Sequence, residues 1–233
     1  MTIGEKVTTI PDYAFSGCSG LTSVSIPNSV TSIGEEVFSN CSGLNSVIVD
    51  KDNNTYDSRD NCNAIIRTST NRLVVGCKNT TIPNSVTSIG KDAFEVCSGL
   101  TPVTIPNSVT YIGEYAFSGC TGLTKLVSQA VAPPSCGYEA FYQVDKATCR
   151  LFVPEESVNK YKAADQWEDF MYISGYDGVD DVSVDTMGAV YEVYNLQGVR
   201  VGSGLRETEI TADNLPHGVY ILVSPQGRKK LKI

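Results

Sequence analysis

The chain has 233 residues, and 18 lysines and arginines against 26 aspartates and glutamates give it a formal net charge of −8. A chain of this length can bury an ample core. Spread negative charge repels phosphate backbones and anionic lipid headgroups, which argues against nucleic acid and membrane surfaces as partners. No apolar run approaches the roughly 20 residues that cross a bilayer, and the start, MTIGEKVTTIPDYAF, lacks the pattern of a secretory signal. We therefore expect no membrane insertion.

The first part of the chain repeats one pattern. The stretch AFSGCSGLTSVSIPNSVTSIG at 14–34 returns as AFEVCSGLTPVTIPNSVTYIG at 93–113. One phenylalanine marks each copy, in steps of 23, 56, 23 and 24 residues: Phe15, Phe38, Phe94, Phe117 and Phe141. A period in the twenties predicts a solenoid of stacked coils. The chain starts inside a repeat, so we expect it to be an excerpt of a longer protein, with Met1 an introduced start and any export signal upstream.

One coil reads VxxIxxxAFxxCxxLxxVxIPxx. Its LxxVxI portion predicts a short strand with inward aliphatic side chains, and stacking pairs such strands in parallel at about 4.8 Å. The phenylalanine and the cysteine fall on the turn that returns the chain to the other side. Because the cysteine slot recurs with the apolar pattern, we expect buried, reduced thiols in its four members. They are Cys18, Cys41, Cys97 and Cys120.

The 56-residue step indicates one enlarged coil, at 50–82. Within it, apolar runs at 64–66 and 73–75 flank a polar turn centred on Ser69 and Thr70, which predicts a β-hairpin. That pairing sets Cys62 opposite Cys77, where a disulfide is one alternative. The repeat alignment also puts Cys77 in the buried leucine slot, so we favour reduced thiols there. The state of Cys136 and Cys149 is left open.

The pattern loosens after residue 130. Residues 131–173 predict a C-terminal cap, with a strand at 149–153 and a helix over 155–168 whose apolar stripe is Val158, Tyr161, Ala164 and Trp167. This helix would cover the last coil of a solenoid spanning 1–173. The stretch SGYDGVDD at 174–181 predicts an exposed linker. Beyond it, the strands AVYEVYN, TEITA, GVYILVS and KKLKI predict a small antiparallel β-sandwich at 174–233.

The coil SVTSIGEEVFSNCSGLNSVIV, with its IPNSVTSIG connectors, resembles the BspA-like leucine-rich repeats of bacterial surface proteins from residue 2 to about 173. The resemblance implies parallel β coils of about 23 residues joined by short turns or helical turns. It also implies a secreted or cell-surface adhesin that binds host or matrix proteins, and it supplies no catalytic residue. The tail, with its NLQG turn, LPHGVY and closing lysine-rich strand, resembles C-terminal sorting domains of Gram-negative bacteria.

Motifs for catalysis and cofactors are lacking in the sequence. The one histidine, His217, falls in a turn of the tail, and there is no CxxC, HExxH, GxGxxG or P-loop pattern. We therefore expect no enzyme and no cofactor. Asp50, Asp52 and Asn54 copy the first ligand spacings of a calcium loop, but the turn glycine and the bidentate glutamate are replaced by Thr55 and Asn61. An ordinary polar loop is the alternative. The sequons at Asn40, Asn53 and Asn79 are expected by chance.

The remaining candidates for function are exposed surfaces of the predicted solenoid. The outward side chains of the LxxVxI strands are expected to form a binding face for a protein or glycan, although they include no aromatic or arginine anchor. This strand row comprises Ser23, Ser25, Ser46, Ile48, Pro102, Thr104, Lys125 and Val127. The tyrosines at 13, 111, 115, 138 and 142 are expected to cover core with their rings and leave the hydroxyl in water. A spacer that holds an upstream domain off the cell is the alternative function.

Overall fold

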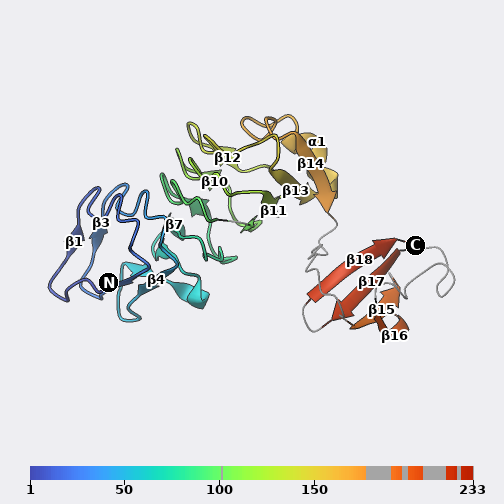
Figure 1. The fold of residues 1–233 in the computed structure, drawn as a ribbon, viewed down its shortest axis with the longest axis horizontal. Helices are drawn as coiled ribbons and strands as arrows, with labels where there is room; N and C mark the ends of the chain where they lie inside the picture. Colours follow the sequence, from blue (N-terminus) through green and yellow to red (C-terminus); the bar gives the residue numbers. More distant parts are fainter. Residues whose placement is uncertain (101, 177–189, 196–198, 207–218, 225–226, 233) are drawn as a thin grey trace. The chain divides into compact units, whose positions relative to one another are not determined.

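The computed structural model describes residues 1–100, 102–176, 190–195, 199–206, 219–224 and 227–232 (Figure 1). It contains two compact units, Met1–Gly175 and Tyr176–Ile233. The first unit is the predicted solenoid, in which successive coils lie side by side and return the chain across two walls of short strands. Among the described residues, no helix is both long and apolar enough to span a membrane.

The first wall carries the predicted LxxVxI strands. It consists of β2 (Ser23–Ile26), β4 (Ser46–Val49), β9 (Val103–Ile105), β11 (Lys125–Ser128), β13 (Arg150–Pro154) and β14 (Tyr172–Tyr176). β2 pairs in parallel with β4, and β9, β11 and β13 pair in parallel in that order, with β14 beside β13. Equivalent residues face each other, as Val24 faces Val47 and Leu126 faces Val103. The predicted repeat register is therefore confirmed.

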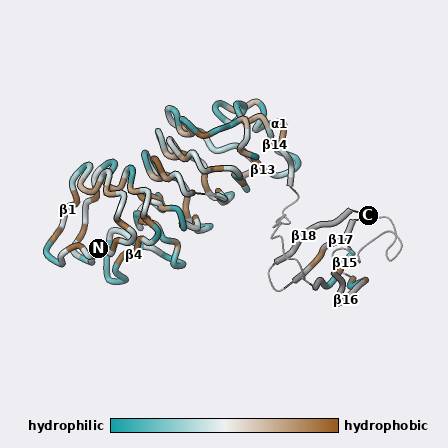
Figure 2. Tube along the Cα trace, viewed as in Figure 1, coloured by the Kyte–Doolittle hydropathy of each residue, from teal (hydrophilic) through white to brown (hydrophobic). Residues whose placement is uncertain are grey.

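The second wall is built on the isoleucine slot of the repeat. Its strands are β1 (Thr9–Ile10), β3 (Ser32–Ile33), β8 (Ser88–Ile89), β10 (Tyr111–Ile112) and β12 (Ser135–Cys136). Ile10 pairs with Ile33, and Ile112 pairs with Ile89, again in parallel. All four of these isoleucines are buried. Figure 2 shows hydrophobic residues recurring along each coil, because the interior between the two walls is the solenoid core.

The turns between the walls stack their phenylalanine rings. Phe15 lies 5.4 Å from Phe38, and Phe117 lies 5.0 Å from Phe94 and 5.4 Å from Phe141, all with nearly parallel planes. Each turn holds two residues in the left-handed region, two positions before and two after its phenylalanine. They are Tyr13 and Gly17, Glu36 and Asn40, Asp92 and Val96, Tyr115 and Gly119, and Glu139 and Gln143.

The cysteine slot departs from the expected burial. Cys41 and Cys120 are buried, and each sulfur lies 3.1 Å from a phenylalanine carbonyl of the preceding turn, whereas Cys97 is half-buried and Cys18 is exposed. The prediction of four buried thiols is therefore wrong for Cys18 and incomplete for Cys97. Cys18 belongs to the first coil of the stack, and Cys97 follows the enlarged coil, so neither packs against a regular preceding turn.

The enlarged coil forms the predicted hairpin and divides the core. β6 (Ile65–Arg67) pairs antiparallel with β7 (Arg72–Val75), β7 continues in parallel to β8, and an unpredicted strand, β5 (Tyr56–Asp57), pairs with β6. A single 3-10 turn, η1 (Arg59–Asn61), joins β5 to the hairpin. Ile65 and Val75 belong to the N-terminal core cluster, whereas Ile66 and Leu73 belong to the C-terminal one. The hairpin is thus a wall buried on both faces.

All eight cysteines of the chain are free thiols, including the two that flank this hairpin, Cys62 and Cys77. Cys62 and Cys77 are both buried but lie in different core clusters, and the sulfur of Cys77 lies 3.3 Å from the carbonyl of Asn63. Burial raises the pKa of Cys62 to about 11 and that of Cys97 and Cys136 to about 12. Buried thiols with raised pKa values are poor nucleophiles, so these sulfurs serve as packing groups.

The cap closes the last coil with less helix than predicted. A 3-10 turn, η2 (Glu155–Ser157), leads into α1 (Val158–Tyr161), and Gln166 then takes a left-handed conformation at φ 63°. Gln166 bonds backbone groups of Ala140 and Gly137, and the indole of Trp167 donates to the carbonyl of Pro134. These bonds to the last coil replace helical ones. The Trp167 ring lies 5.1 Å from that of Phe141, so the indole packs against the last coil.

The second unit contains an antiparallel sheet in the order β16-β15-β17-β18. Its strands are β15 (Val190–Asn195), β16 (Arg200–Arg206), β17 (Val219–Ser224) and β18 (Gly227–Lys232). Three predicted strands of the tail are confirmed, and β16 was not predicted. The predicted TEITA strand, His217 and most of the 174–181 linker lie outside the described residues. The predicted start of the linker is wrong, because residues 174–176 belong to β14, which pairs beside β13.

Candidate binding surfaces

The strand row lies on the first wall, but the enlarged coil divides it. Ser23 faces Ser46 and Ser25 faces Ile48 on one sheet, whereas Thr104 faces Val127 on the other. Ile48 is 56% exposed. Val127 is buried at 8%, so it cannot offer the surface that the sequence suggested. Pro102 is exposed, and Lys125 is half-buried.

Two residues missed by the sequence analysis extend the second half of this row. β13 sets Arg150 opposite Lys125 and Phe152 opposite Val127. The Nζ atom of Lys125 lies 5.1 Å from the centre of the half-buried Phe152 ring, a cation–π contact. The row therefore does contain an aromatic and an arginine. The alternation Arg-Leu-Phe-Val at 150–153 was the available signal, but it does not align with the repeat.

Two of the calcium candidates, Asp50 and Asp52, already make polar contacts with neighbouring residues. Asp50 accepts a hydrogen bond from the Asp52 amide at 2.8 Å, and Asp52 pairs with Lys51 at 2.9 Å. Asn54, the third candidate ligand, is exposed. In the described part of the chain, no group of three or more histidine, cysteine, aspartate or glutamate side chains could hold a metal ion.

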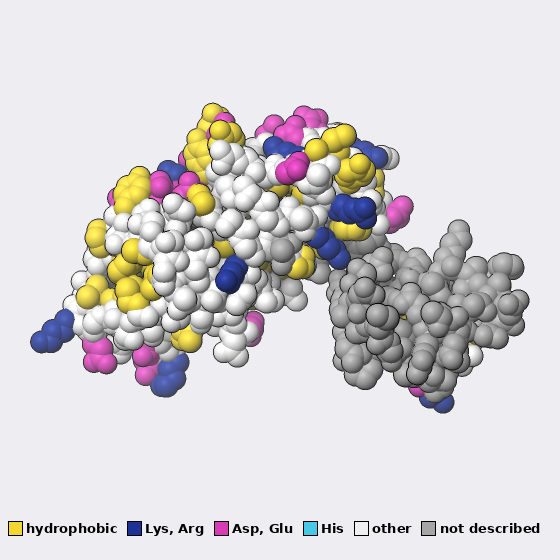
Figure 3. All heavy atoms as spheres, viewed as in Figure 1, with side chains coloured by type: hydrophobic (Ala, Val, Ile, Leu, Met, Phe, Trp, Pro, Cys, Tyr) yellow, Lys and Arg dark blue, Asp and Glu magenta, His cyan; other side chains and the backbone are white. Residues whose placement is uncertain are grey.

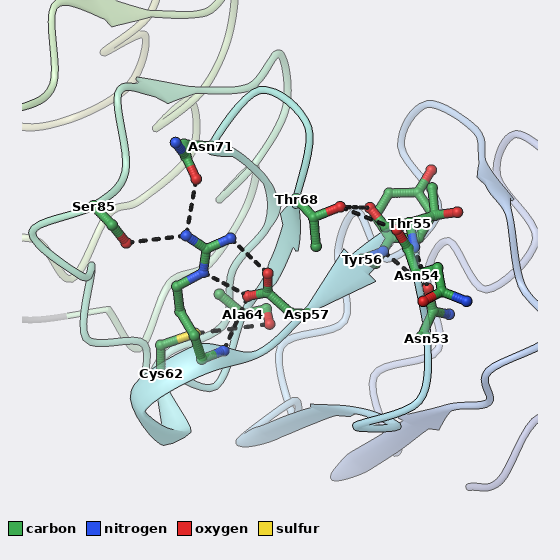
Figure 4. Close-up of polar contacts among 11 residues, drawn as sticks. Asn53, Asn54, Thr55, Tyr56, Asp57, Cys62, Ala64, Thr68, Asn71 and Ser85 are labelled. Atoms are coloured by element: carbon green, nitrogen blue, oxygen red, sulfur yellow. Dashed lines mark hydrogen bonds and ion pairs between the residues drawn. The ribbon is translucent and has the colours of Figure 1, made fainter.

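The neighbouring polar residues tie the enlarged coil together (Figure 4). Asn53 is 7% exposed, and its amide donates to the carbonyls of Pro27 and Val30 and accepts from the amides of Thr55 and Tyr56, at 2.8 to 2.9 Å. Its sequon is therefore part of the packed interior. Arg59 pairs with Asp57 and donates to Asn71 and Ser85 across the coil. These polar groups hold loops in place.

Four tyrosines lie on two neighbouring turns and on the adjacent strand β10, and we name this surface the tyrosine edge: Tyr111, Tyr115, Tyr138 and Tyr142. Tyr138 is 63%, Tyr142 48% and Tyr111 42% exposed, so the expectation that their rings cover core is wrong. The same holds for Tyr13, which is 58% exposed on the first turn. The rings of Tyr13, Tyr138 and Tyr142 stand out because their backbone lies on turns whose interior is already filled by phenylalanine, whereas Tyr115 is half-buried and Tyr111 lies on β10.

The tyrosine edge is flanked by acidic groups. The Tyr115 and Tyr138 rings meet edge to face at 5.6 Å. A hydrogen bond to Glu139, and then its charge, raise the pKa of Tyr138 above its ordinary value, while desolvation followed by the charges of Glu139 and Glu114 raises that of Tyr115. Both phenols thus stay protonated at neutral pH and can donate hydrogen bonds. Figure 3 shows hydrophobic and acidic side chains side by side along the turns.

A cavity of about 280 Å³ lies between the turns of Phe38 and Phe94, and we name it the turn gap. The enlarged coil supplies a hairpin but no phenylalanine turn, so one layer of the turn stack is absent there. Segment 74–77 forms part of the lining, and the Phe94 ring lies so close over Gly76 that a Cβ there would meet it at 2.0 Å.

Polar contacts cross the rim of the turn gap. Ser39 donates to Glu95, and Lys91 pairs with Glu35 at 3.1 Å. Burial and then the charge of Glu95 raise the pKa of Asp92 to about 6. Among the described residues, the Oδ2 atom of Asp92 has no hydrogen-bond partner.

Known proteins similar to this chain include three bacterial leucine-rich repeat proteins of solved structure. The solved structure of a leucine-rich repeat protein from Eubacterium ventriosum is 17% identical, with a TM-score of 0.48 over 75% of this chain and 54% of that one. A leucine-rich cell surface protein from Faecalibacterium prausnitzii is 24% identical, with a TM-score of 0.47 over 74% of this chain and 52% of that one. A leucine-rich repeat protein from Bacteroides ovatus is 25% identical, with a TM-score of 0.45 over 76% and 42%.

The chain thus spans about half the length of these structures. A search of curated proteins gave no match. The family model for the BspA type leucine-rich repeat region, in six copies, matches residues 1–69 and 65–162. These ranges contain the stacked coils, the enlarged coil and the start of the cap. The chain therefore belongs to the BspA-type leucine-rich repeat family.

Proposed function

We propose that this solenoid is a non-enzymatic binding module of a secreted or cell-surface bacterial protein, and that it binds a protein or glycan through the tyrosine edge. The observation that carries the proposal is the exposure of Tyr138 and Tyr142 on one turn and of Tyr111 on the adjacent strand β10. Tyrosine is enriched among the residues that dominate binding energies, and it offers a large contact area for few rotatable bonds.

The backbone beneath these rings is fixed by its neighbours. The amides of Tyr115, Phe117 and Gly119 donate to the carbonyls of Tyr138, Ala140 and Tyr142 at 2.8 to 3.0 Å. A ligand therefore meets a surface whose order is already established, which lowers the entropy lost on binding. Glu114 and Glu139 favour a neutral, hydroxyl-rich or basic ligand over an acidic one.

The second half of the strand row is a second candidate for the same function. Lys125 and Phe152 stack there beside Arg150, and aromatic and arginine side chains are common binding anchors. A spacer role predicts that neither surface binds anything. The resemblance of the tail to a sorting domain supports export, and comparing secretion with and without residues 174–233 tests it.

A panel of purified matrix proteins and a glycan array, probed with this chain, tests the proposal. We expect saturable binding at micromolar or lower concentration. Tyr138→Ala with Tyr142→Ala should weaken it at least about 10-fold, as expected for buried aromatic anchors. Tyr13→Ala, an equally exposed tyrosine on the first turn, is the matched control and should change little. Absence of binding at about 100 μM would favour the spacer.

A further inference from the structure

Regular turns of the solenoid are joined by a backbone ladder. The amides of Tyr13, Phe15 and Gly17 donate to the carbonyls of residues 35, 37 and 39 in the next turn, at 2.9 to 3.0 Å. The amides of Asp92, Phe94 and Val96 repeat this pattern toward residues 114, 116 and 118. Three amides of each turn, spaced by two residues around its phenylalanine, are therefore used to hold the following turn.

The ladder stops at the turn of Phe38. Its equivalent amides belong to Glu36, Phe38 and Asn40, and within the described residues none of the three has a hydrogen-bond partner. The reason is the enlarged coil, which adds a hairpin to the walls but no turn to this stack. An unpaired amide away from bulk water loses free energy comparable to a lost hydrogen bond.

The opposite wall of the turn gap carries the matching acceptors. The carbonyls of Lys91, Ala93 and Glu95 are equivalent to those of 35, 37 and 39. The amide of Gly76 donates to Ala93 at 2.7 Å, whereas the carbonyls of Lys91 and Glu95 accept no hydrogen bond within the described part of the chain. Glu36 and Phe38 thus line the donor side of the gap, with the exposed Asn40 beyond its edge, and Lys91 and Glu95 line the acceptor side. This is the arrangement of a three-stranded parallel ladder from which the middle strand is missing.

The rim contacts are consistent with a gap one strand wide. The side chain of Ser39 donates to that of Glu95 across the gap. Two such side chains and their hydrogen bond can join backbones at most roughly 10 Å apart, which is about two strand spacings. Phe38 and Phe94 line the cavity, and the two rings are not among the stacked pairs. The lining carries five acidic and three basic side chains: Asp12, Glu35, Glu36, Asp92 and Glu95, and Arg67, Arg72 and Lys91.

We propose that the turn gap binds an extended peptide segment of a partner protein, whose backbone completes the interrupted ladder. The carbonyls of the segment accept from the amides of Glu36, Phe38 and Asn40, and two of its amides donate to Lys91 and Glu95. Its central side chain is apolar and packs against Phe38, because Gly76 already lies against the Phe94 ring. Basic residues flank it, because acidic side chains predominate in the lining. This site is separate from the tyrosine edge and does not depend on its function.

The solenoid itself supplies the best probe. Segment 113–119, GEYAFSG, occupies this position against the turn of Phe94, where its carbonyls accept from the amides of Asp92, Phe94 and Val96. We would titrate the blocked peptide GEYAFSG, with one lysine added at each end, into ¹⁵N-labelled chain. Saturable shifts of the amides of Glu36, Phe38 and Asn40 are expected, while those of Tyr115, Phe117 and Gly119, which belong to the next complete turn, stay unchanged.

Two matched pairs make the test specific. A peptide N-methylated at the position of Gly119 loses the bond to Glu95 and should bind several-fold more weakly than one N-methylated at the position of Glu114. In the protein, Val74→Phe fills the gap and should reduce binding at least about 10-fold, whereas Val131→Phe, at an exposed valine outside the gap, should not.

The peptide pair keeps the test valid even if Val74→Phe disturbs folding. No saturable shift at these amides up to about 1 mM peptide overturns the proposal. Shifts confined to the tyrosine edge, or equal binding of the two N-methylated peptides, overturn it as well. Because the readout is local to the gap, failure here leaves the function proposed for the tyrosine edge untouched.

Discussion

Replacing Asn53 by alanine should destabilise the N-terminal half of the solenoid more than any other single change in the polar loop. The side chain is 7% exposed and makes four hydrogen bonds, to the backbone of Pro27, Val30, Thr55 and Tyr56. Each is worth about 1 kcal/mol net, and groups left unpaired in the interior add to the loss. We therefore expect a decrease of about 3 to 5 kcal/mol in the free energy of unfolding.

Urea unfolding followed by far-UV circular dichroism measures this change, and hydrogen exchange of residues 20–66 locates it, because repeat proteins can unfold in parts. Asn54→Ala is the control. Asn54 is exposed, and the bond that Thr68 donates to its backbone carbonyl survives the substitution, so an effect within about 0.5 kcal/mol is expected. A loss below about 1 kcal/mol for Asn53→Ala, or equal losses for both variants, would refute the structural role given to Asn53.

Four further predictions follow from single residues and one boundary. Val96 is β-branched at φ 53°, so Val96→Gly should stabilise the chain by about 0.5 to 1 kcal/mol, and a clear loss of stability would contradict the strain. Burial raises the pKa of Asp92 to about 6, so the folded state binds the extra proton between about pH 4 and 6 and loses stability as the pH rises through that window. Asp92→Asn should accordingly stabilise the chain at pH 7.5 by about 1 kcal/mol, allowing for solvent screening. The gain in the same urea assay should be smaller at pH 4, and an equal gain at both pH values would contradict the raised pKa. Under a thiol reagent, Cys18 should react in the folded state and Cys120 only after denaturation; mass spectrometry would show the reverse order if the burial is wrong. Limited proteolysis should cut first within 177–181, after β14, and leave a folded fragment, whereas aggregation of that fragment would make the tail part of the cap.

The repeat made most of the solenoid predictable. One apolar slot recurring at a fixed period, such as Val24 and Val47, defines both the strand and its register, because only equivalent residues stack in a parallel pair. The hairpin was predictable for the same kind of reason. Its two continuous apolar runs are typical of strands buried on both faces, and the structure places such a strand pair between two cores.

The sequence could not show where the repeat is incomplete. Cys18 has nearly the same local sequence as Cys120, differing only in Ser19 against Thr121, and its exposure depends on which coils lie beside it in space. The helix expected over 155–168 shows the same limit. Tyr161 and Trp167 of its apolar stripe are buried and Val158 and Ala164 are half-buried, but bonds from Gln166 and Trp167 to the last coil replace helical hydrogen bonds. Tertiary partners decide both outcomes, and local sequence does not encode them.

The candidate surfaces were the least predictable part. The strand row followed from strand alternation, yet Phe152 was missed because it falls outside the repeat. The tyrosines were noticed but assigned to covering core, since a sequence does not reveal that phenylalanines such as Phe117 and Phe141 already fill the space beneath them. The turn gap has no sequence signal of its own, because it is formed by a turn that the enlarged coil lacks.

The most direct test of the proposed function is a hydrogen-exchange footprint of the chain with and without the ligand found in the binding panel. We predict slower amide exchange on ligand binding in residues 111–115 and 138–142, the turns that carry the tyrosine edge. The footprint should disappear in the Tyr138→Ala, Tyr142→Ala variant. Protection confined to the first wall, or the absence of any saturable ligand, would contradict a binding role for this edge.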